Sequence, residues 1–240
     1  MSFSRTVEPE LLDAITPGDP RAIRARRDLQ RVNTIMGHTL IWKRILREIV
    51  SPERAPANVV ELGAGDGTLL LRLAPTLAVK WPRVRLQLVD RRPAVSRESL
   101  KAFAALGWQA EVVKADAIDW ISTVPRTDLI VANLFLHHFD NTRLTELFRH
   151  VAGKSEAFVA CEPRRSALAL LGSRLLYLIG CGPVARYDAV VSVCAGFSGA
   201  ELTALWPENN NWQLHETSAG LFSHIFAAER SCASMRAVQS

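Results

Sequence analysis

The 240-residue sequence contains only four cysteines, and no two of them form a C-x-x-C pair. They stand at Cys161, Cys181, Cys194 and Cys232. This spacing excludes a zinc knuckle and a dithiol redox motif, so we expect free thiols and no metal site. Hydrophobic residues make up 48% of the chain and charged residues 22%. That composition excludes a disulfide scaffold and a disordered chain, and it predicts one domain of ordinary α/β size.

Targeting and membrane-spanning signals are missing as well. The first residues, "MSFSRTVEPELLDA", have no apolar core and carry acids where a secretion signal carries bases, which predicts a cytoplasmic protein. The most apolar stretch, "SALALLGSRLLYLIGCGPVA" at 166–185, is interrupted by Arg174 and by glycines. It therefore predicts a covering helix, or lid, rather than a membrane span. Peripheral contact with a membrane stays open.

Much of the formal charge of +5 lies near the N-terminus, in "RAIRARRDLQR" at 21–31. The apolar residues that follow have the spacing of one helix face: Ile35, Met36, Leu40, Ile41, Ile45 and Ile49. We expect two amphipathic helices separated by Gly37, with the basic face in solvent or against an anionic or membrane surface. Residues 1–56 thus predict an N-terminal helical extension, or lid, ahead of the main domain at 57–240.

From residue 58 onward, short apolar runs alternate with helical stretches. The runs that predict strands are "NVVEL", "VRLQLVD", "AEVVKA", "DLIVANL" and "AFVACE". This alternation is typical of a parallel α/β sheet with helices on both faces. Two later runs, "WQLHETSA" at 212–219 and "LFSHIFAAER" at 221–230, meet near Gly220. They predict a hairpin at the edge of the sheet, with the last strand antiparallel to its neighbours.

A glycine-rich turn follows the first predicted strand, in "NVVELGAGDGTLLL". The spacing is G-x-G-x-G, because Thr68 stands where the dinucleotide fingerprint has its third glycine, and no phosphate-loop lysine is present. The strand ends on Glu61, and Asp66 lies inside the turn. Two carboxylates would repel a polyphosphate but suit a ligand with an ammonium group. We therefore expect a ligand that is cationic at one end.

Two further acids end the next two predicted strands. Asp90 closes "LQLVD", where a carboxylate can accept both hydroxyls of a ribose, and Asp116 in "KADAIDW" could accept from an adenine amino group. Either aspartate alone could simply cap a helix. Acids at three successive strand ends together indicate an adenosine joined to an amino acid.

This arrangement resembles the class I S-adenosylmethionine-dependent methyltransferases. "VVELGAGDG", "LQLVD", "VVKADA" and "DLIVANLFLHHF" are similar to the first four motifs of that family. The resemblance implies a Rossmann-like, seven-stranded, mostly parallel sheet in the order 3-2-1-4-5-7-6, with one antiparallel strand and S-adenosylmethionine as the cofactor. The residues it assigns to cofactor binding are Glu61, Gly63, Ala64, Gly65, Asp66, Gly67, Asp90, Arg91, Asp116, Ala117, Asn133 and Leu134.

Three further segments, "RRDLQRVNTIMG", "EPRRSALALLGSRLLYL" and "RYDAVVSVCAGFSGAEL", resemble a bacterial subgroup often encoded near type III polyketide synthases. That resemblance implies a small, largely apolar acceptor, phenolic or quinone-like, methylated on oxygen. The chain departs from the subgroup at Cys161, Glu162 and Pro163, where Asn-Asp-Leu is expected before Arg-Arg-Ser. The departure keeps the acid but adds a proline to the expected wall of the acceptor site.

A base that removes the proton of a phenol during attack would assist such a transfer. His137 and His138, just past the fourth predicted strand, are the candidate catalytic residues, because histidine titrates near neutral pH. His137 is favoured since it lies nearer the strand end, and a structural role for either histidine stays open.

Two other functions stay open beside the main one. The basic N-terminal helix could serve an RNA or protein methyltransferase. Alternatively, the chain could be a catalytically silent protein of this fold that acts through binding. A nucleic-acid substrate is disfavoured, because "NLFL" replaces the Asn-Pro-Pro-Tyr or Asp-Pro-Pro-Tyr motif of the DNA amino-methyltransferases. The sequence makes no prediction of the oligomeric state.

Overall fold

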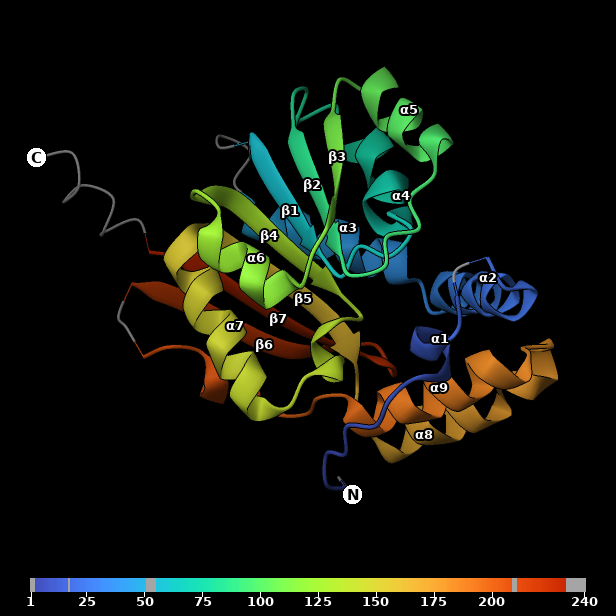
Figure 1. Cartoon of the computed structure of the whole chain (residues 1–240). Coiled ribbons are helices and arrows are strands. Elements are labelled where there is room, and N and C mark those ends of the chain that lie inside the picture. Colours follow the sequence, from blue (N-terminus) through green and yellow to red (C-terminus); the bar gives the residue numbers. More distant parts are fainter. Residues whose placement is uncertain (1–2, 17, 51–54, 209–210, 232–240) are drawn as a thin grey trace, which may run out of the picture.

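The computed structural model describes residues 3–16, 18–50, 55–208 and 211–231. A seven-stranded sheet runs through the molecule in the order β3-β2-β1-β4-β5-β7-β6 (Figure 1). The strands are β1 Asn58–Leu62, β2 Arg85–Asp90, β3 Gln109–Lys114, β4 Thr127–Asn133, β5 Ser155–Pro163, β6 Trp212–Ala219 and β7 Ser223–Arg230. Strand β7 pairs antiparallel with both β5 and β6, while the pairs from β3 to β5 are parallel. The predicted fold class, strand order and terminal hairpin are confirmed.

Helices cover both faces of the sheet (Figure 1). They are α1 Leu11–Ala14, α2 Pro20–Ile35, α3 His38–Ile49, α4 Thr68–Leu77, α5 Arg97–Ala105, α6 Ala117–Thr123, α7 Asn141–Lys154, α8 Ala167–Arg174 and α9 Pro183–Ala195, with 3-10 turns η1 Leu136–His138, η2 Leu175–Ile179 and η3 Thr203–Leu205. One hydrophobic core joins the sheet to α6 and α7, and a second joins it to α3, α4 and α5. Because both faces are buried, the central strands are continuous apolar runs rather than alternating ones.

The predicted N-terminal helix pair is present, and its two helices belong to different parts of the fold. Gly37 adopts a left-handed conformation, with φ of 67°, and separates α2 from α3 as expected. Helix α3 buries Trp42, Ile45 and Leu46 in the same core as β1 and α4. Helix α2 instead packs against α9. The N-terminal extension thus contributes α3 to the layer that covers the sheet, whereas its other helix, α2, packs against α9.

Helices α1, α2, α8 and α9, together with η2, form a layer that we call the helical cap (Figure 1). Asp28 on α2 is buried and accepts a 2.8 Å hydrogen bond from the amide of Gly182, just before α9. The single covering helix predicted at 166–185 is wrong. Helix α8 ends at Arg174, and after η2 the chain reverses through Gly180, whose φ is 79°. Among the described residues, no helix combines the length and the apolarity that crossing a membrane requires.

The turn before β3 provides a test of backbone strain. Gly107 has a φ of 82°, and a Cβ built there would lie 2.6 Å from the carbonyl oxygen of Pro82. We expect Gly107→Ala to lower the free energy of unfolding by more than about 1 kcal/mol, because an L side chain is strained in this conformation and also meets backbone. Urea unfolding followed by circular dichroism measures the change.

The matched control is Gly153→Ala in the last turn of α7, where a Cβ meets nothing within 4 Å. This variant should be neutral or stabilising by up to about 1 kcal/mol, since alanine favours the helix over glycine. Equal loss of stability in both variants would contradict the assignment of strain to Gly107.

Candidate active site

The turn between β1 and α4 carries the three glycines of the first motif, and all three have positive φ angles: 69° at Gly63, 54° at Gly65 and 72° at Gly67. The amides of Gly63 and Ala64 donate to the carbonyl of Val89 at the end of β2, at 2.9 and 3.1 Å. A Cβ on Gly63 would lie 2.2 Å from the ring of Phe135, whereas a Cβ on Gly65 would meet nothing within 4 Å. Gly63 therefore permits close packing, while Gly65 faces open space.

Glu61 lies at the floor of a small cavity of about 110 Å³ beside this turn. The residues that line the cavity are Gln30, Asn33, His38, Thr39, Glu61, Gly63, Ala64, Asp66, Thr68, Leu69, Arg72 and Asn133. Glu61 is 2% exposed, and its Oε2 atom has no hydrogen-bond partner among the described residues. Burial, and then the charges of Asp66 and Asp90, raise the pKa of Glu61 well above 4.5. A buried carboxylate in this state favours a cationic partner.

Asp90 and Asp116 stand at the ends of β2 and β3, as predicted. Asp90 accepts the amide of Gly65 at 2.8 Å and the amide of Arg92 at 2.6 Å, so it ties the glycine turn to β2. Asp116 caps α6 through a 2.9 Å bond from the Ile118 amide. Its second oxygen faces two guanidinium groups, that of Arg91 at 3.9 Å and that of Arg143 at 3.5 Å. Ala117 follows as the buried first residue of α6.

Asn133 ends β4 and Leu134 follows it, and each of the two lines one of two cavities. The side-chain oxygen of Asn133 accepts hydrogen bonds from the ring nitrogens of His38 and Trp42, both on α3. Asn133 lines the small cavity, and Leu134 lines a larger one. Leu134 has a φ of 51°, which is uncommon for a residue with a side chain. A strained residue held at this position is typical of a functional site.

His137 on η1 lies between two carboxylates and is only 3% exposed. Its Nδ1 atom is 2.7 Å from Glu162 at the end of β5, and its Nε2 atom is 3.2 Å from Glu10. Burial favours the neutral ring, but the hydrogen bonds and charges of Glu10 and Glu162 prevail and raise the pKa of His137 to about 9. The ring is therefore an imidazolium at neutral pH, held by an acid on each nitrogen.

Glu10 reaches His137 from an extended segment at 3–10, which we call the N-terminal strap. Arg5 on the strap donates to the carbonyl oxygens of Phe139 and Ala195, at 2.7 and 2.8 Å. At the strap's end, the buried Asp188 of α9 accepts the amide of Leu11 at 2.7 Å. These contacts fix Glu10 in place, where it also accepts from Ser192. Burial opposes ionisation of Glu10, yet its contacts with His137 lower its pKa to about 2.

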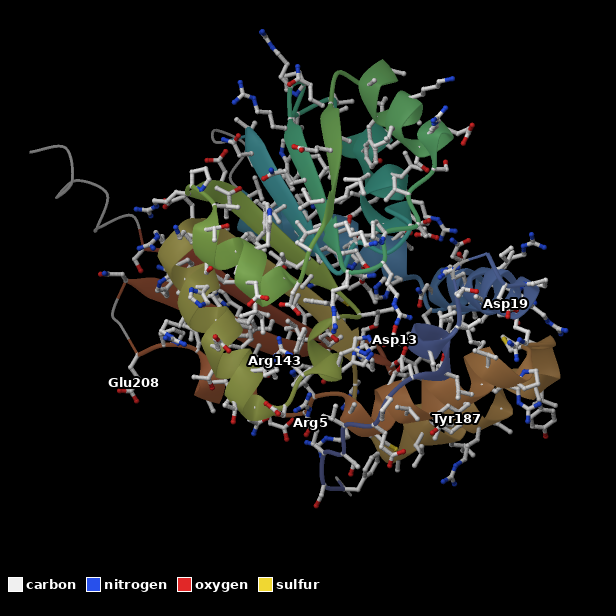
Figure 2. The ribbon with its side chains drawn as sticks, viewed as in Figure 1. Arg5, Asp13, Asp19, Arg143, Tyr187 and Glu208 are labelled. Atoms are coloured by element: carbon white, nitrogen blue, oxygen red, sulfur yellow. The ribbon has the colours of Figure 1, made fainter. Side chains whose placement is uncertain are left out.

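His138 differs from its neighbour in both exposure and charge. Its ring lies 4.3 Å from that of His137, and its Nδ1 atom is 3.7 Å from Asp13 on α1. Figure 2 shows Asp13 between the sheet and helices α8 and α9. Burial, and then the charge of His137, lower the pKa of His138. His138 is therefore a neutral imidazole at neutral pH. Its side chain is 27% exposed to solvent.

A larger cavity of about 400 Å³ separates the histidines from the helical cap. Most of its wall is apolar and comes from α2, α8, η2, α9 and the turn before β7. The apolar lining includes Leu29, Val32, Ile35, Met36, Leu134, Ala169, Leu176, Ile179, Val193 and Phe222. The titratable lining residues are Glu10, Asp13, His137, His138 and Glu162, and the other polar lining residues are Asn33, Ser173, Ser192 and Ser223. Asn33 lines both cavities, so the two adjoin.

Glu10, His137 and His138 could also hold a metal ion, because one ligand atom from each lies within 4.8 Å of the others. The sequence predicted no metal site, because its cysteines form no metal-binding pair. In the structure, the two ring nitrogens of His137 lie at hydrogen-bond distance from Glu162 and Glu10, so the two carboxylates are already partners of the ring.

Comparisons with known proteins agree with this geometry. Residues 60–154 match the model of a methyltransferase domain family. The plantazolicin methyltransferase BpumL, solved with S-adenosylhomocysteine (SAH), has a TM-score of 0.65 and 12% identity over 89% of this chain and 92% of its own. The plantazolicin methyltransferase BamL, solved with a triazolic desmethylPZN analogue and SAH, has a TM-score of 0.64 and 14% identity over 90% of this chain and 93% of its own. An O-methyltransferase family protein from Burkholderia thailandensis has a TM-score of 0.55 and 17% identity over 91% of this chain and 64% of its own. No curated protein sequence matches.

The matched model and the sheet order define a methyltransferase domain with a Rossmann-like fold. Residues 60–154 thus form a methyltransferase domain, which supports the class I S-adenosylmethionine-dependent methyltransferase resemblance drawn from the four motifs. The helical cap lies outside the matched residues, so the walls of the larger cavity are known from the structure alone.

Sequence reasoning placed the strand-end residues correctly but missed those that approach from far along the chain. Glu10 is 127 positions from His137, and no local pattern connects them. Asp188 and Ser192 belong to no sequence motif that would have predicted their contacts with Leu11 and Glu10. Glu162 was visible as the acid after the fifth strand, but its contact with His137 required the tertiary structure. For His38, its position in a predicted helix was the only feature of the sequence that could have pointed to the site.

The two carboxylates around His137 predict a pH-dependent stability. The pKa of His137 is raised from 6.5 to about 9, so its contribution to folding is complete below about pH 6.5 and is lost as the pH rises to about 9. We expect the stability of the wild-type protein to fall more over this range than that of His137→Gln. Urea unfolding at a series of pH values measures both slopes.

His150→Gln is the matched control, because His150 lies on α7, away from this cluster. Its slope should equal that of the wild-type protein. Identical slopes in all three proteins would show that His137 does not hold its proton in the folded state.

Proposed function

We propose that this enzyme transfers the methyl group of S-adenosylmethionine to a hydroxyl group of a small, largely apolar, phenolic or quinone-like molecule. The observation that carries this proposal is the larger cavity, whose mainly apolar walls meet the titratable side chains around His137 and His138, beside the small cavity that Glu61 lines. An apolar body would fill the cavity, and its one polar group would meet the histidines.

The strand-end residues fit the parts of the cofactor. The unpartnered Oε2 atom of Glu61 would accept from the ammonium group, and the open space at Gly65 allows a ligand to approach the backbone. Asp90 would hold the ribose, while Arg91, Asp116 and Ala117 would border the adenine. The remaining residues assigned to the cofactor's methionine part and sulfonium are Gly63, Ala64, Asp66, Gly67, Asn133 and Leu134. When bound, the cofactor supplies an activated methyl group, so the protein mainly needs to align and deprotonate the acceptor.

We assign the proton acceptor to His138 rather than to His137, which the sequence favoured. Both ring nitrogens of His137 are occupied by carboxylates, and its raised pKa keeps it protonated at neutral pH. His138 is neutral and lines the larger cavity. Asp13 and Glu10, both near its ring, favour the charge that it gains on accepting a proton. These properties suit a general base.

His137 contributes by its position and charge. Because it is an imidazolium beside His138, it keeps His138 in the neutral form that can accept a proton. Glu10 and Glu162 in turn hold the ring in one orientation. His137 thus acts as a positioning residue in this scheme.

Two lines of support favour the substrate class. The segments that resemble the subgroup associated with type III polyketide synthases include α8 and α9, which line the larger cavity. BamL was solved with an analogue of a desmethyl plantazolicin, and the pyocyanin biosynthetic protein PhzM, with a TM-score of 0.51, is another structure of this fold. A cavity of about 400 Å³ agrees with a small-molecule acceptor.

His138→Ala tests the proposed chemistry. We expect it to bind SAH normally and to lose about 10²- to 10⁴-fold in kcat on a phenolic acceptor. The loss should shrink as the pH approaches the pKa of the phenol, because the phenolate then forms without a base. Methyl transfer to a set of phenols and hydroxyquinones, followed by mass spectrometry across a pH series, measures this effect.

His150→Ala serves as the control and should leave the pH profile unchanged. If His138→Ala lost activity equally at every pH, the assignment of the base would be wrong. EDTA should not lower the wild-type activity. Restoration of a chelated enzyme by a divalent cation would instead assign Glu10, His137 and His138 to a metal ion.

Glu61→Gln tests the cofactor site. Glu61 is protonated over a wider pH range than usual, and an ammonium group favours its ionised form, so binding of SAH should release a proton. The affinity of the wild-type protein should therefore increase as the pH rises toward the raised pKa of Glu61. Glu61→Gln should bind more weakly and show a flatter pH dependence, measured by calorimetry in buffers of different ionisation enthalpy.

Glu98→Gln, on the exposed surface of α5, is the matched control and should behave as the wild type. Equal pH dependence in the wild type and Glu61→Gln would exclude Glu61 as the partner of the ammonium group.

A further inference from the structure

The tip of the helical cap exposes an unusual amount of apolar surface. Six of the fourteen exposed large hydrophobic side chains among the described residues lie within positions 168–179. They are Leu168, Leu171, Leu175, Tyr177, Leu178 and Ile179, which we call the cap tip. Leu178 is 66% exposed and Leu171 is 53% exposed. A cluster of this kind on a water-facing surface indicates a binding face.

Cationic side chains outnumber acids around the cap tip, where Asp19 at the start of α2 pairs with Arg21 at 2.8 Å. Between Glu162 and Asp188 the sequence contains no acidic residue, and the arginines at 174 and 186 are exposed. Helix α2 lies alongside, since the guanidinium of Arg31 donates to the carbonyl of Ile179 at 3.3 Å. This helix adds the exposed arginines at 21, 24, 27 and 31. Its only acid, Asp28, is buried. The apolar cap tip is therefore flanked by cationic side chains.

The larger cavity reaches the same surface. Leu176 and Ile179 of η2 line the cavity, and Ile179 also belongs to the cap tip. Ile35 at the end of α2 lines the cavity while remaining 65% exposed. A molecule on the cap surface would thus find the apolar wall of the cavity continuous with the apolar residues outside it.

The position of the cap favours contact with an extended surface. Helices α2, α8 and α9 project to one side of the sheet (Figure 1). Figure 2 shows Asp19, at the start of α2, and Tyr187, on α9, along this projecting part. A flat partner could therefore reach the cap tip without meeting the strands or α4 to α7.

We propose that the cap tip docks on an anionic lipid bilayer, with its leucines and tyrosine at the boundary between headgroups and acyl chains and its arginines on lipid phosphates. Apolar side chains combined with arginines are the chemistry that binds such a surface. Docking would turn the mouth of the larger cavity toward the bilayer, from which an apolar acceptor would enter. This last step rests on the proposed function, whereas docking itself does not.

Co-sedimentation with vesicles tests docking without any methyl transfer. The wild-type protein should sediment with vesicles of phosphatidylcholine and phosphatidylglycerol, more weakly with phosphatidylcholine alone, and less in high salt. The double variant Leu171→Asp, Leu178→Asp should partition at least about tenfold more weakly, because two immersed apolar side chains become charged. Val79→Asp is the matched control, since Val79 is 84% exposed after α4, and it should partition as the wild type.

A second pair of variants separates charge from apolar contact. Arg174→Glu should weaken binding to the anionic vesicles by about fivefold or more and leave binding to phosphatidylcholine unchanged. Arg149→Glu, an exposed charge reversal on α7, should have no effect. SAH binding, measured in each variant, should equal that of the wild type and shows that the site is intact.

Three results would overturn docking on a bilayer. The first is a wild-type protein that sediments with neither kind of vesicle. The second is equal loss in Val79→Asp and in the double variant. The third is a solution dimer, or an RNA complex, that the double variant or Arg174→Glu disrupts while vesicle binding is absent. Because no acceptor is used, failure of the proposed chemistry would leave the docking result unaffected, and failure of docking would leave the His138 test unaffected.

Discussion

The carboxylate of Glu162 holds the polar end of the larger cavity together. It is fully buried and accepts the backbone amides of Phe135 and Leu136, each at 2.9 Å, in addition to the ring of His137. A buried carboxylate is tolerated only when such donors replace the water it has lost. The end of β5, the turn after β4 and the histidine pair are therefore positioned by one side chain. Removing it would take this acceptor from four groups, the amides of Phe135, Leu136 and His137 and the ring of His137.

Two other buried acids show how the environment decides the role of a carboxylate. Glu10 has a protonated ring and a hydroxyl against it, and its pKa is lowered to about 2. Glu61 has acids near it and an oxygen without a partner among the described residues, and its pKa is raised. The first carboxylate is satisfied within the protein and stabilises it. The second has no such partner among the described residues, which agrees with the role proposed for it toward the ammonium group of the cofactor.

The larger cavity is built from segments that are distant in sequence. The strap at 3–10, helix α2 and the segment from α8 to α9 meet over the ends of β4 and β5. Contacts such as that of Asp28 with the Gly182 amide, and that of Asp188 with Leu11, hold these segments to one another. In the proposed function, the sheet would provide the cofactor side of the site and the cap the acceptor side. Variation in the cap could change the acceptor without disturbing the strand ends.

What the sequence determined by itself is local in origin. The strand at 58–62, the break at Gly37 and the strand at 212–219 follow from short-range patterns of apolar residues and glycines, and the structure has them at the predicted places. The acids at the ends of β1, β2 and β3 follow in the same way, because parallel strands bring their carboxyl ends to one edge. Tertiary structure alone decided that Glu10 meets His137, that both nitrogens of His137 are occupied, and that the segment at 166–185 breaks at Gly180. These features depend on which distant segments pack together, and on the burial and charge that result, for which a local pattern contains no information.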